Sequence, residues 1–244
     1  MPRQDALSWL ESMRTPAGAW PYQPGGDAMP EPTLYALAAG AASSLEWLRR
    51  TELGWAWLIL PLAVDDDALR DIATERILAA EGVPGPVPGD YDGSLVGWSW
   101  TDGTASWVQP TTWALASLRV LGLGDHPRAL EGIRLLQDRQ SVDGGWNAGT
   151  PNVLGTELGG YLYLTGWACF ALPPSEAVER GFTFLGGVED HPSTMNLALA
   201  MLAHSAHDRP SDHLAELLLE RQDADGSFGG QVDRTALAAW ALSR

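Results

Sequence analysis

The sequence contains no lysine, and its 15 basic residues are all arginines. Lysine forms Schiff bases with carbonyl substrates and contacts the phosphates of a P-loop, so the sequence excludes both mechanisms. Basic residues are scarce altogether, because 31 acidic residues outnumber the arginines and give a formal net charge of -16. We expect this charge to repel nucleic acid and anionic membrane surfaces.

Cysteine and long apolar runs are also scarce. A single cysteine, Cys169, excludes an internal disulfide. The longest apolar run, residues 53–64, contains Pro61 and is shorter than the roughly 20 residues that a membrane-spanning helix needs. The first residues show no cationic stretch followed by an apolar one. These features predict a cytoplasmic protein of one domain, residues 1–244, without integral membrane insertion.

A repeated plan runs along the chain, in which a helix leads into a small polar turn that an aromatic residue closes. The four turns end at Gly18-Ala-Trp20, Leu53-Gly-Trp55, Asp143-Gly-Gly-Trp146 and Asp225-Gly-Ser-Phe228. Glycine supplies unusual backbone angles there, and we expect the four aromatic rings to act as structural wedges between helices. A second, more apolar helix then begins near a Thr or Ser suited to an N-cap, at Thr33, Thr111, Ser193 and Thr235.

The two kinds of helix differ in polarity, and this difference predicts the fold. The first kind carries charge on one face, whereas the second is apolar nearly all round and must be enclosed. We predict outer helices at residues 3–14, 43–51, 66–81, 125–140, 174–187 and 209–222. We predict inner helices at residues 31–42, 54–64, 109–123, 156–172, 190–206 and 232–243. Six such hairpins can close into an all-α toroid, (α/α)6, which leaves no bare apolar end.

One segment departs from the repeat. Residues 82–108 are rich in Gly and Pro and carry Trp98, Trp100 and Trp107. Loops of this length and aromatic content are often functional.

The sequences of two of the turns resemble the repeat of a known protein family. Gln137-Asp-Arg-Gln140-Ser-Val-Asp-Gly-Gly-Trp146 and Arg221-Gln-Asp-Ala-Asp-Gly-Ser-Phe228 are similar to the repeat of squalene-hopene and oxidosqualene cyclases. Protein prenyltransferase β-subunits share this prenyltransferase/squalene oxidase repeat. The resemblance implies an α/α toroid with a central cavity, where we expect the function to lie. A shared fold does not settle the activity, which has to be argued from the site.

The cyclases of this family that start by protonation carry an Asp-x-Asp-Asp-Thr-Ala motif, whose middle Asp is the acid at the start of an inner helix. The segment Gln231-Val-Asp233-Arg234-Thr235-Ala236 resembles this motif in letters and in position. An N-cap is the alternative role for Asp233, because Arg234 would lower its pKa rather than raise it. The run Asp65 to Asp67 is also similar, but it precedes an outer helix, where carboxylates serve as caps.

Other candidate residues lie at or on the predicted inner helices. Glu31 and Glu157 occupy comparable starts of inner helices and are further candidate acids. Ring faces stabilise carbocations, although core packing is the alternative role for each ring. The candidate substrate-binding residues are Tyr35, Trp113, Tyr161, Tyr163, Trp167, Arg234, Trp98 and Trp100, and Trp240 also falls on an inner helix.

Zinc is the metal of protein prenyltransferases, which hold it with an Asp, a Cys two residues later and a distant His. No Asp stands two residues before Cys169, and the histidines show no ligand spacing with it. We therefore expect no metal and no cofactor.

Two functions follow from these observations. The first is a terpenoid cyclase-like enzyme that acts on an isoprenoid or similar apolar substrate by acid-initiated chemistry. The alternative is a non-catalytic module that binds an apolar ligand or a partner protein. An enzyme needs a carboxylate in a roomy cavity, whereas a scaffold can fill that space with side chains.

Overall fold

The chain is mostly helical. The computed structural model describes residues 2–42, 45–80, 82–85 and 91–244, and its only sheet in this part of the chain has two strands. The all-α prediction is confirmed. Residues 43–44 and 81, at one end of the predicted helices 43–51 and 66–81, and residues 86–90 of the predicted loop lie outside the described residues.

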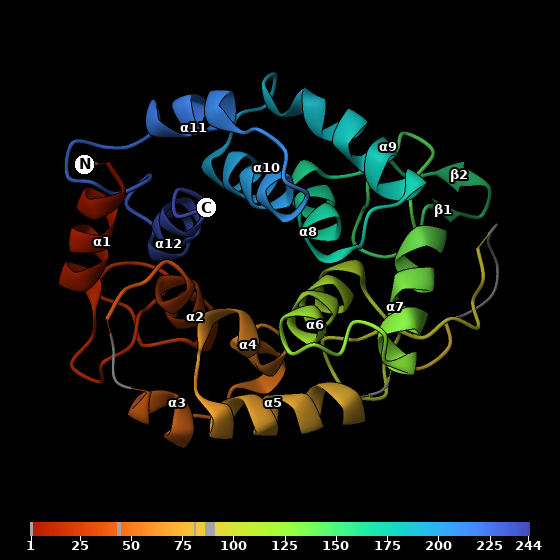
Figure 1. Ribbon diagram of the computed structural model, residues 1–244, viewed down its shortest axis with the longest axis horizontal. Coiled ribbons are helices and arrows are strands. Elements are labelled where there is room, and N and C mark those ends of the chain that lie inside the picture. Colours follow the sequence, from red (N-terminus) through yellow and green to blue (C-terminus); the bar gives the residue numbers. More distant parts are fainter. Residues whose placement is uncertain (1, 43–44, 81, 86–90) are drawn as a thin grey trace.

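Figure 1 shows the helices in two layers around a common centre. The inner layer consists of α2 (Pro30–Ala38), η1 (Gly54–Leu58) with α4 (Leu60–Ala63), α6 (Val108–Val120), α8 (Leu162–Ala171), α10 (Thr194–Ala206) and α12 (Val232–Ala241). The outer layer consists of α1 (Pro2–Met13), α3 (Glu46–Arg50), α5 (Asp67–Ala79), α7 (Pro127–Asp138), α9 (Glu176–Leu185) with η2 (Gly186–Val188), and α11 (Asp212–Leu219). The apolar and the charged helices therefore separate as their polarity requires.

The inner helices contact one another in chain order, and the last of them, α12, contacts α2. The two ends of the chain meet at this point. Gln222 donates a side-chain hydrogen bond to the carbonyl of Pro2 at 2.8 Å, and the backbone N–H of Val232 donates to the carbonyl of Tyr22 at 3.0 Å. The last repeat thus packs against the first.

A recurring hydrogen bond joins each aromatic turn to the inner helix that follows. The backbone N–H of the aromatic residue donates to a threonine hydroxyl in the first turn of that helix, at 2.9 to 3.0 Å. The pairs are Trp20 with Thr33, Trp98 with Thr111, Trp146 with Thr165, and Phe228 with Thr235. Each tryptophan of this set also donates its indole N–H to a carbonyl of the preceding outer helix, at Leu10, Ile77 and Leu136.

We call this hydrogen bond between an aromatic turn and the following inner helix a structural joint, and it corrects two predictions. We predicted that Trp55 closes an aromatic turn, but Trp98 makes the hydrogen bond of this kind. The reason is that the long loop before α6 contains its own aromatic turn, whereas the hairpin that begins with α3 does not use one. Thr33, Thr111 and Thr235 are not N-caps, since they lie inside the helices that they join. Ser193 does cap α10 by accepting from the backbone N–H of Asn196, and Asp66 caps α5 by accepting from that of Leu69.

The predicted inner helix 156–172 is wrong at its start. Its first residues belong to a hairpin instead, in which β1 (Asn152–Val153) pairs with β2 (Thr156–Glu157), and α8 begins only at Leu162. Glycine explains the difference. A Cβ on Gly160 would lie 2.6 Å from the Cα of Gly145, so the two backbones touch here and leave no room for a helix with side chains.

Candidate functional site

Two of the candidate acids come together where the ends of the chain meet. Glu31 lies in the first turn of α2, Asp233 lies in the first turn of α12, and these two helices are in contact. Burial raises the pKa of Glu31, and the charge of Asp233 adds to this shift. The contact between α2 and α12 thus brings together two helix starts, each with a carboxyl group, from opposite ends of the sequence.

Glu31 is held by two tyrosines. Tyr35, one turn later in α2, donates its hydroxyl to Glu31 at 2.9 Å, and the hydroxyl of Tyr22 donates to the second carboxylate oxygen. Burial raises the pKa of Glu31 above its ordinary value, and the two tyrosine hydrogen bonds lower it only in part. The same burial raises the pKa of Tyr22 and Tyr35. We call this group, with Asp233, the acid cluster.

Asp233 has a more mixed environment. Burial raises its pKa, while the backbone N–H and the charge of the adjacent Arg234 lower it in part. Arg234 itself is exposed, so it lies at the rim and does not enter the interior. Burial thus shifts both carboxyl groups in the direction of the neutral form, which is the direction that suits a general acid.

Glu157 does not join the acid cluster. It lies on β2, it is exposed, and Figure 1 places β2 across the molecule from α2 and α12. We expected Glu157 at the start of an inner helix, but the hairpin places it on the outside of the molecule.

Aromatic side chains fill the centre of the inner layer. Trp167 of α8 is only 2% exposed, and its ring lies 5.9 Å from that of Trp113, 6.3 Å from that of Tyr35 and 6.2 Å from that of Trp240. These neighbours come from α6, α2 and α12, so the contacts extend across the middle of the fold. The space left beside Tyr35 and Trp240 has no room for a water molecule. The roomy central cavity that we expected is thus occupied by side chains.

A pocket lies at the outer end of this aromatic series. It has a volume of about 430 Å3 and is lined by Trp55, Trp57 and Trp100, among others, and we call it the tryptophan pocket. The rings of Trp55 and Trp100 meet at 84° with centroids 5.2 Å apart. Both rings also contact Trp113, at 5.1 and 5.5 Å, so the wall of the pocket continues into the filled centre.

The tryptophan pocket also offers polar groups. The indole N–H of Trp57 is buried and has no hydrogen-bond partner among the described residues. The guanidinium of Arg76 lies 4.6 Å from the centre of the Trp57 ring and 3.8 Å from a carboxylate oxygen of Glu52. Arg76 can donate a hydrogen bond to a ligand in the pocket, and Glu52 can accept one.

A second hollow lies beside the hairpin. It has a volume of about 530 Å3, and Trp107 and Tyr161 are among its lining residues, so we call it the Trp107–Tyr161 cleft. The side chain of Tyr161 is 54% exposed and stacks on that of Tyr163 with ring centroids 6.2 Å apart. Burial raises the pKa of Tyr163. These two tyrosines thus lie at the start of α8, near the surface rather than in the centre.

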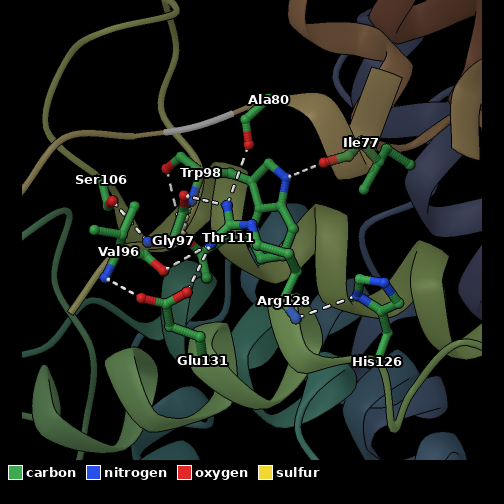
Figure 2. Close-up of polar contacts among 10 residues, drawn as sticks. All are labelled: Ile77, Ala80, Val96, Gly97, Trp98, Ser106, Thr111, His126, Arg128 and Glu131. Atoms are coloured by element: carbon green, nitrogen blue, oxygen red, sulfur yellow. Dashed lines mark hydrogen bonds and ion pairs between the residues drawn. The ribbon is translucent and has the colours of Figure 1, made fainter. Parts of the chain in front are cut away.

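Trp98 lies in a structural joint. Figure 2 shows its backbone N–H directed at Thr111 and its indole N–H directed at the carbonyl of Ile77. Arg128 of α7 stacks on the Trp98 ring at 4.5 Å and donates to the carbonyl oxygens of Ala80, Val96 and Gly97. Trp98 is fully enclosed by these contacts, so a ligand has no access to its ring.

Sequence reasoning did not identify several of these residues. Tyr22 follows a turn aromatic and carries no pattern of its own, and its contact with Glu31 depends on closure of the fold. Trp55 and Trp57 lie within an apolar run that we interpreted as one buried helix. Pro61, at the start of α4, was the signal that this helix is broken.

In the described residues, no group of three or more His, Cys, Asp and Glu side chains is arranged to hold a metal ion. No helix in the same part of the chain has both the length and the apolar character needed to span a membrane. Comparison of the chain with known protein families and with curated proteins finds no match.

Proposed function

We propose that this chain is a non-catalytic module that binds a small apolar ligand in the tryptophan pocket, on an (α/α)6 toroid scaffold of the prenyltransferase/squalene oxidase repeat type. The scaffold is supported by the unbroken series of contacts among the inner helices and by the aromatic turns that repeat along the chain.

One observation carries this proposal: the centre is filled, and its aromatic series opens outward at Trp55 and Trp100. A substrate that cyclises inside a toroid needs space in the centre, and Trp167 occupies that space. The tryptophan pocket, in contrast, has the volume and the aromatic lining that are typical of small-molecule sites.

The chemistry of the pocket defines the ligand class. Its three tryptophans favour a hydrophobic body, and the polar lining residues Glu52, Arg76 and Asp102 favour one hydroxyl on that body. The net charge of -16 disfavours an anionic ligand. A neutral isoprenoid alcohol meets all three conditions.

Titration with geraniol, farnesol and geranylgeraniol, followed by tryptophan fluorescence and calorimetry, tests the proposal. We expect saturable binding of at least one alcohol, and Trp100→Ala should weaken it about tenfold, because a large ring contact is lost. Trp107→Ala is the matched control, since Trp107 lines the other hollow. Binding that is absent, or that survives Trp100→Ala unchanged, would contradict the proposal.

A second function is favoured by the acid cluster. Glu31 and Asp233 are half-buried at the neighbouring starts of α2 and α12. Glu31 accepts a hydrogen bond from Tyr35, whose ring contacts the aromatic centre, and this arrangement suits protonation of an isoprenoid double bond. The reaction would require Trp167 to move out of the centre. Mass spectrometry of incubated isoprenoids distinguishes the two functions. A cyclised product that disappears with Glu31→Gln or Asp233→Asn would establish the enzyme and overturn the binding module.

A further inference from the structure

A further hollow adjoins the tryptophan pocket. It has a volume of about 490 Å3 and lies between α3 and α5, which are neighbours in the outer layer (Figure 1), and we call it the α3–α5 hollow. The tryptophan pocket and the α3–α5 hollow share three lining residues, Glu52, Trp57 and Arg76. The two spaces therefore meet at these side chains, and the ring of Trp57 belongs to both.

One face of α5 runs along both spaces. Its lining residues recur at helical spacing, which places them on a single face of the helix. This face is roughly 18 Å long, at a rise of about 1.5 Å per residue. From the start of the helix to its C-cap, the lining residues are Ala68, Leu69, Ile72, Arg76, Ala79 and Ala80. The tryptophan pocket and the α3–α5 hollow thus form one continuous groove, which we call the α5 groove.

Arg76 lies where the two parts of the α5 groove meet. Its guanidinium stacks on the ring of Trp57 at 4.6 Å and lies 3.8 Å from a carboxylate oxygen of Glu52. Both partners of this ion pair are exposed, and exposed ion pairs contribute little free energy. The Arg76 side chain can therefore shift at small cost, so it divides the groove without closing it.

The other arginines that line the α3–α5 hollow already have acidic partners. Arg49 donates a hydrogen bond to Asp66 at 2.6 Å, and Arg50 forms an ion pair with Glu46 at 2.5 Å. A paired arginine offers little to an anionic group of a ligand. The α3–α5 hollow therefore favours an uncharged, apolar chain, as the tryptophan pocket does.

We propose that the ligand of the tryptophan pocket is a long isoprenoid alcohol, whose chain passes Trp57 and lies against Ile72 in the α3–α5 hollow. This inference rests on the proposed function and deepens it by naming the chain length. Each part of the groove alone has a volume in the lower half of the range of small-molecule sites, roughly 300–1,000 Å3, whereas the whole groove accepts an extended chain. Ile72 is 43% exposed, and the far end of such a chain would cover it. Ile72 is thus the residue that determines specificity for chain length.

Calorimetric titration with geraniol and geranylgeraniol tests the inference. Geranylgeraniol is long enough to enter both parts of the groove, whereas geraniol has half its carbon chain and fits within the tryptophan pocket. We expect Ile72→Gln to weaken the binding of geranylgeraniol about tenfold, because an apolar contact is lost, and to leave the affinity for geraniol unchanged. Leu130→Gln is the matched control, since Leu130 is 46% exposed on the outer helix α7 and lines neither part of the groove.

Ala68→Trp tests the same contact by filling the α3–α5 hollow. Ala68 is exposed there, so a larger side chain should occupy the hollow without disturbing the core. The preference for geranylgeraniol over geraniol should then disappear. Circular dichroism verifies that both variants are folded.

The outcomes separate this inference from the proposed function. If Trp100→Ala weakens the binding of both alcohols but Ile72→Gln weakens neither, or weakens both equally, the inference is wrong and the proposed function stands. A preference for geranylgeraniol that survives in folded Ala68→Trp would overturn the inference in the same way. If neither alcohol binds the wild type, the proposed function fails and the inference fails with it.

Discussion

The hydroxyl of Tyr35 donates a 2.9 Å hydrogen bond to the carboxylate of Glu31, one helical turn earlier in α2. The ring of the same tyrosine stacks on Trp167 in the centre of the fold. Tyr35 therefore connects the acid cluster to the aromatic centre, and a change in either region should be detectable in the other.

Replacement of Glu31 should alter how stability depends on pH. Burial raises the pKa of Glu31 in the folded protein. A raised folded-state pKa means that the stabilising contribution is complete below the ordinary pKa of 4.5 and is lost as the pH rises through the folded-state value. We expect the melting temperature of the wild type, relative to that of Glu31→Gln, to fall as the pH rises above about 4.5.

Thermal melts across this pH range measure the difference between the two proteins. Glu157→Gln is the control, because it also removes one carboxylate but from an exposed position outside the acid cluster. If Glu31→Gln and Glu157→Gln give the same pH dependence, the burial of Glu31 has no energetic consequence.

Removal of the Trp167 ring should open the centre. Large-to-small substitutions of a buried tryptophan cost about 3–5 kcal/mol, so Trp167→Ala should lower the free energy of unfolding by that amount. An apolar cavity of this kind binds small aromatic molecules. We expect indole to raise the melting temperature of Trp167→Ala but not that of the wild type. An indole effect of equal size on both proteins would show that the centre is already open.

Loss of one joint threonine should destabilise the fold. Thr111→Val leaves the backbone N–H of Trp98 buried without an acceptor, which costs about 1–3 kcal/mol. Thr183→Val is the control, because the Thr183 hydroxyl is exposed and bonds only within its own helix. Urea denaturation measures both, and a Thr111→Val protein as stable as the control would show that the joint hydrogen bond is dispensable.

Cys169 should react with thiol reagents only after the protein opens. Its side chain is fully buried, and burial raises the pKa of the thiol to about 12. The reactive thiolate is therefore both rare and inaccessible in the folded state. We expect the rate of reaction with an aromatic disulfide reagent to follow the rate of unfolding as urea is added. A fast reaction in the absence of urea would indicate local opening of α8.

Much of the fold was predictable because it depends on local pattern. The contrast between charged and apolar helices identified the two layers, and the helix starts near Ser193 and Asp66 followed from ordinary capping. One prediction failed at Pro61, which breaks the helix predicted at residues 54–64, and another failed where glycine acts through a neighbour in space. Gly160 needs to be glycine because Gly145 touches it, and no feature near residue 160 reveals this contact.

The candidate site was less predictable than the fold. Asp233 and Glu31 were each recognisable as carboxyl groups at the start of an apolar helix, but their pairing was not. Trp100 was identified by its place in an unusual loop, whereas its partner Trp55 was assigned to a structural turn. Which aromatic residue lines the tryptophan pocket and which one supports the fold depends on contacts between distant segments.

The amino-acid sequence by itself determined that the chain is helical and which helices are enclosed, because helix periodicity and polarity act over a few residues. Only the tertiary structure decided that Trp167 fills the centre, that the helix starts with Glu31 and Asp233 are neighbours, and that Trp55, Trp57 and Trp100 line one pocket. These outcomes depend on side-chain volumes and on contacts between opposite ends of the chain, which no local pattern encodes.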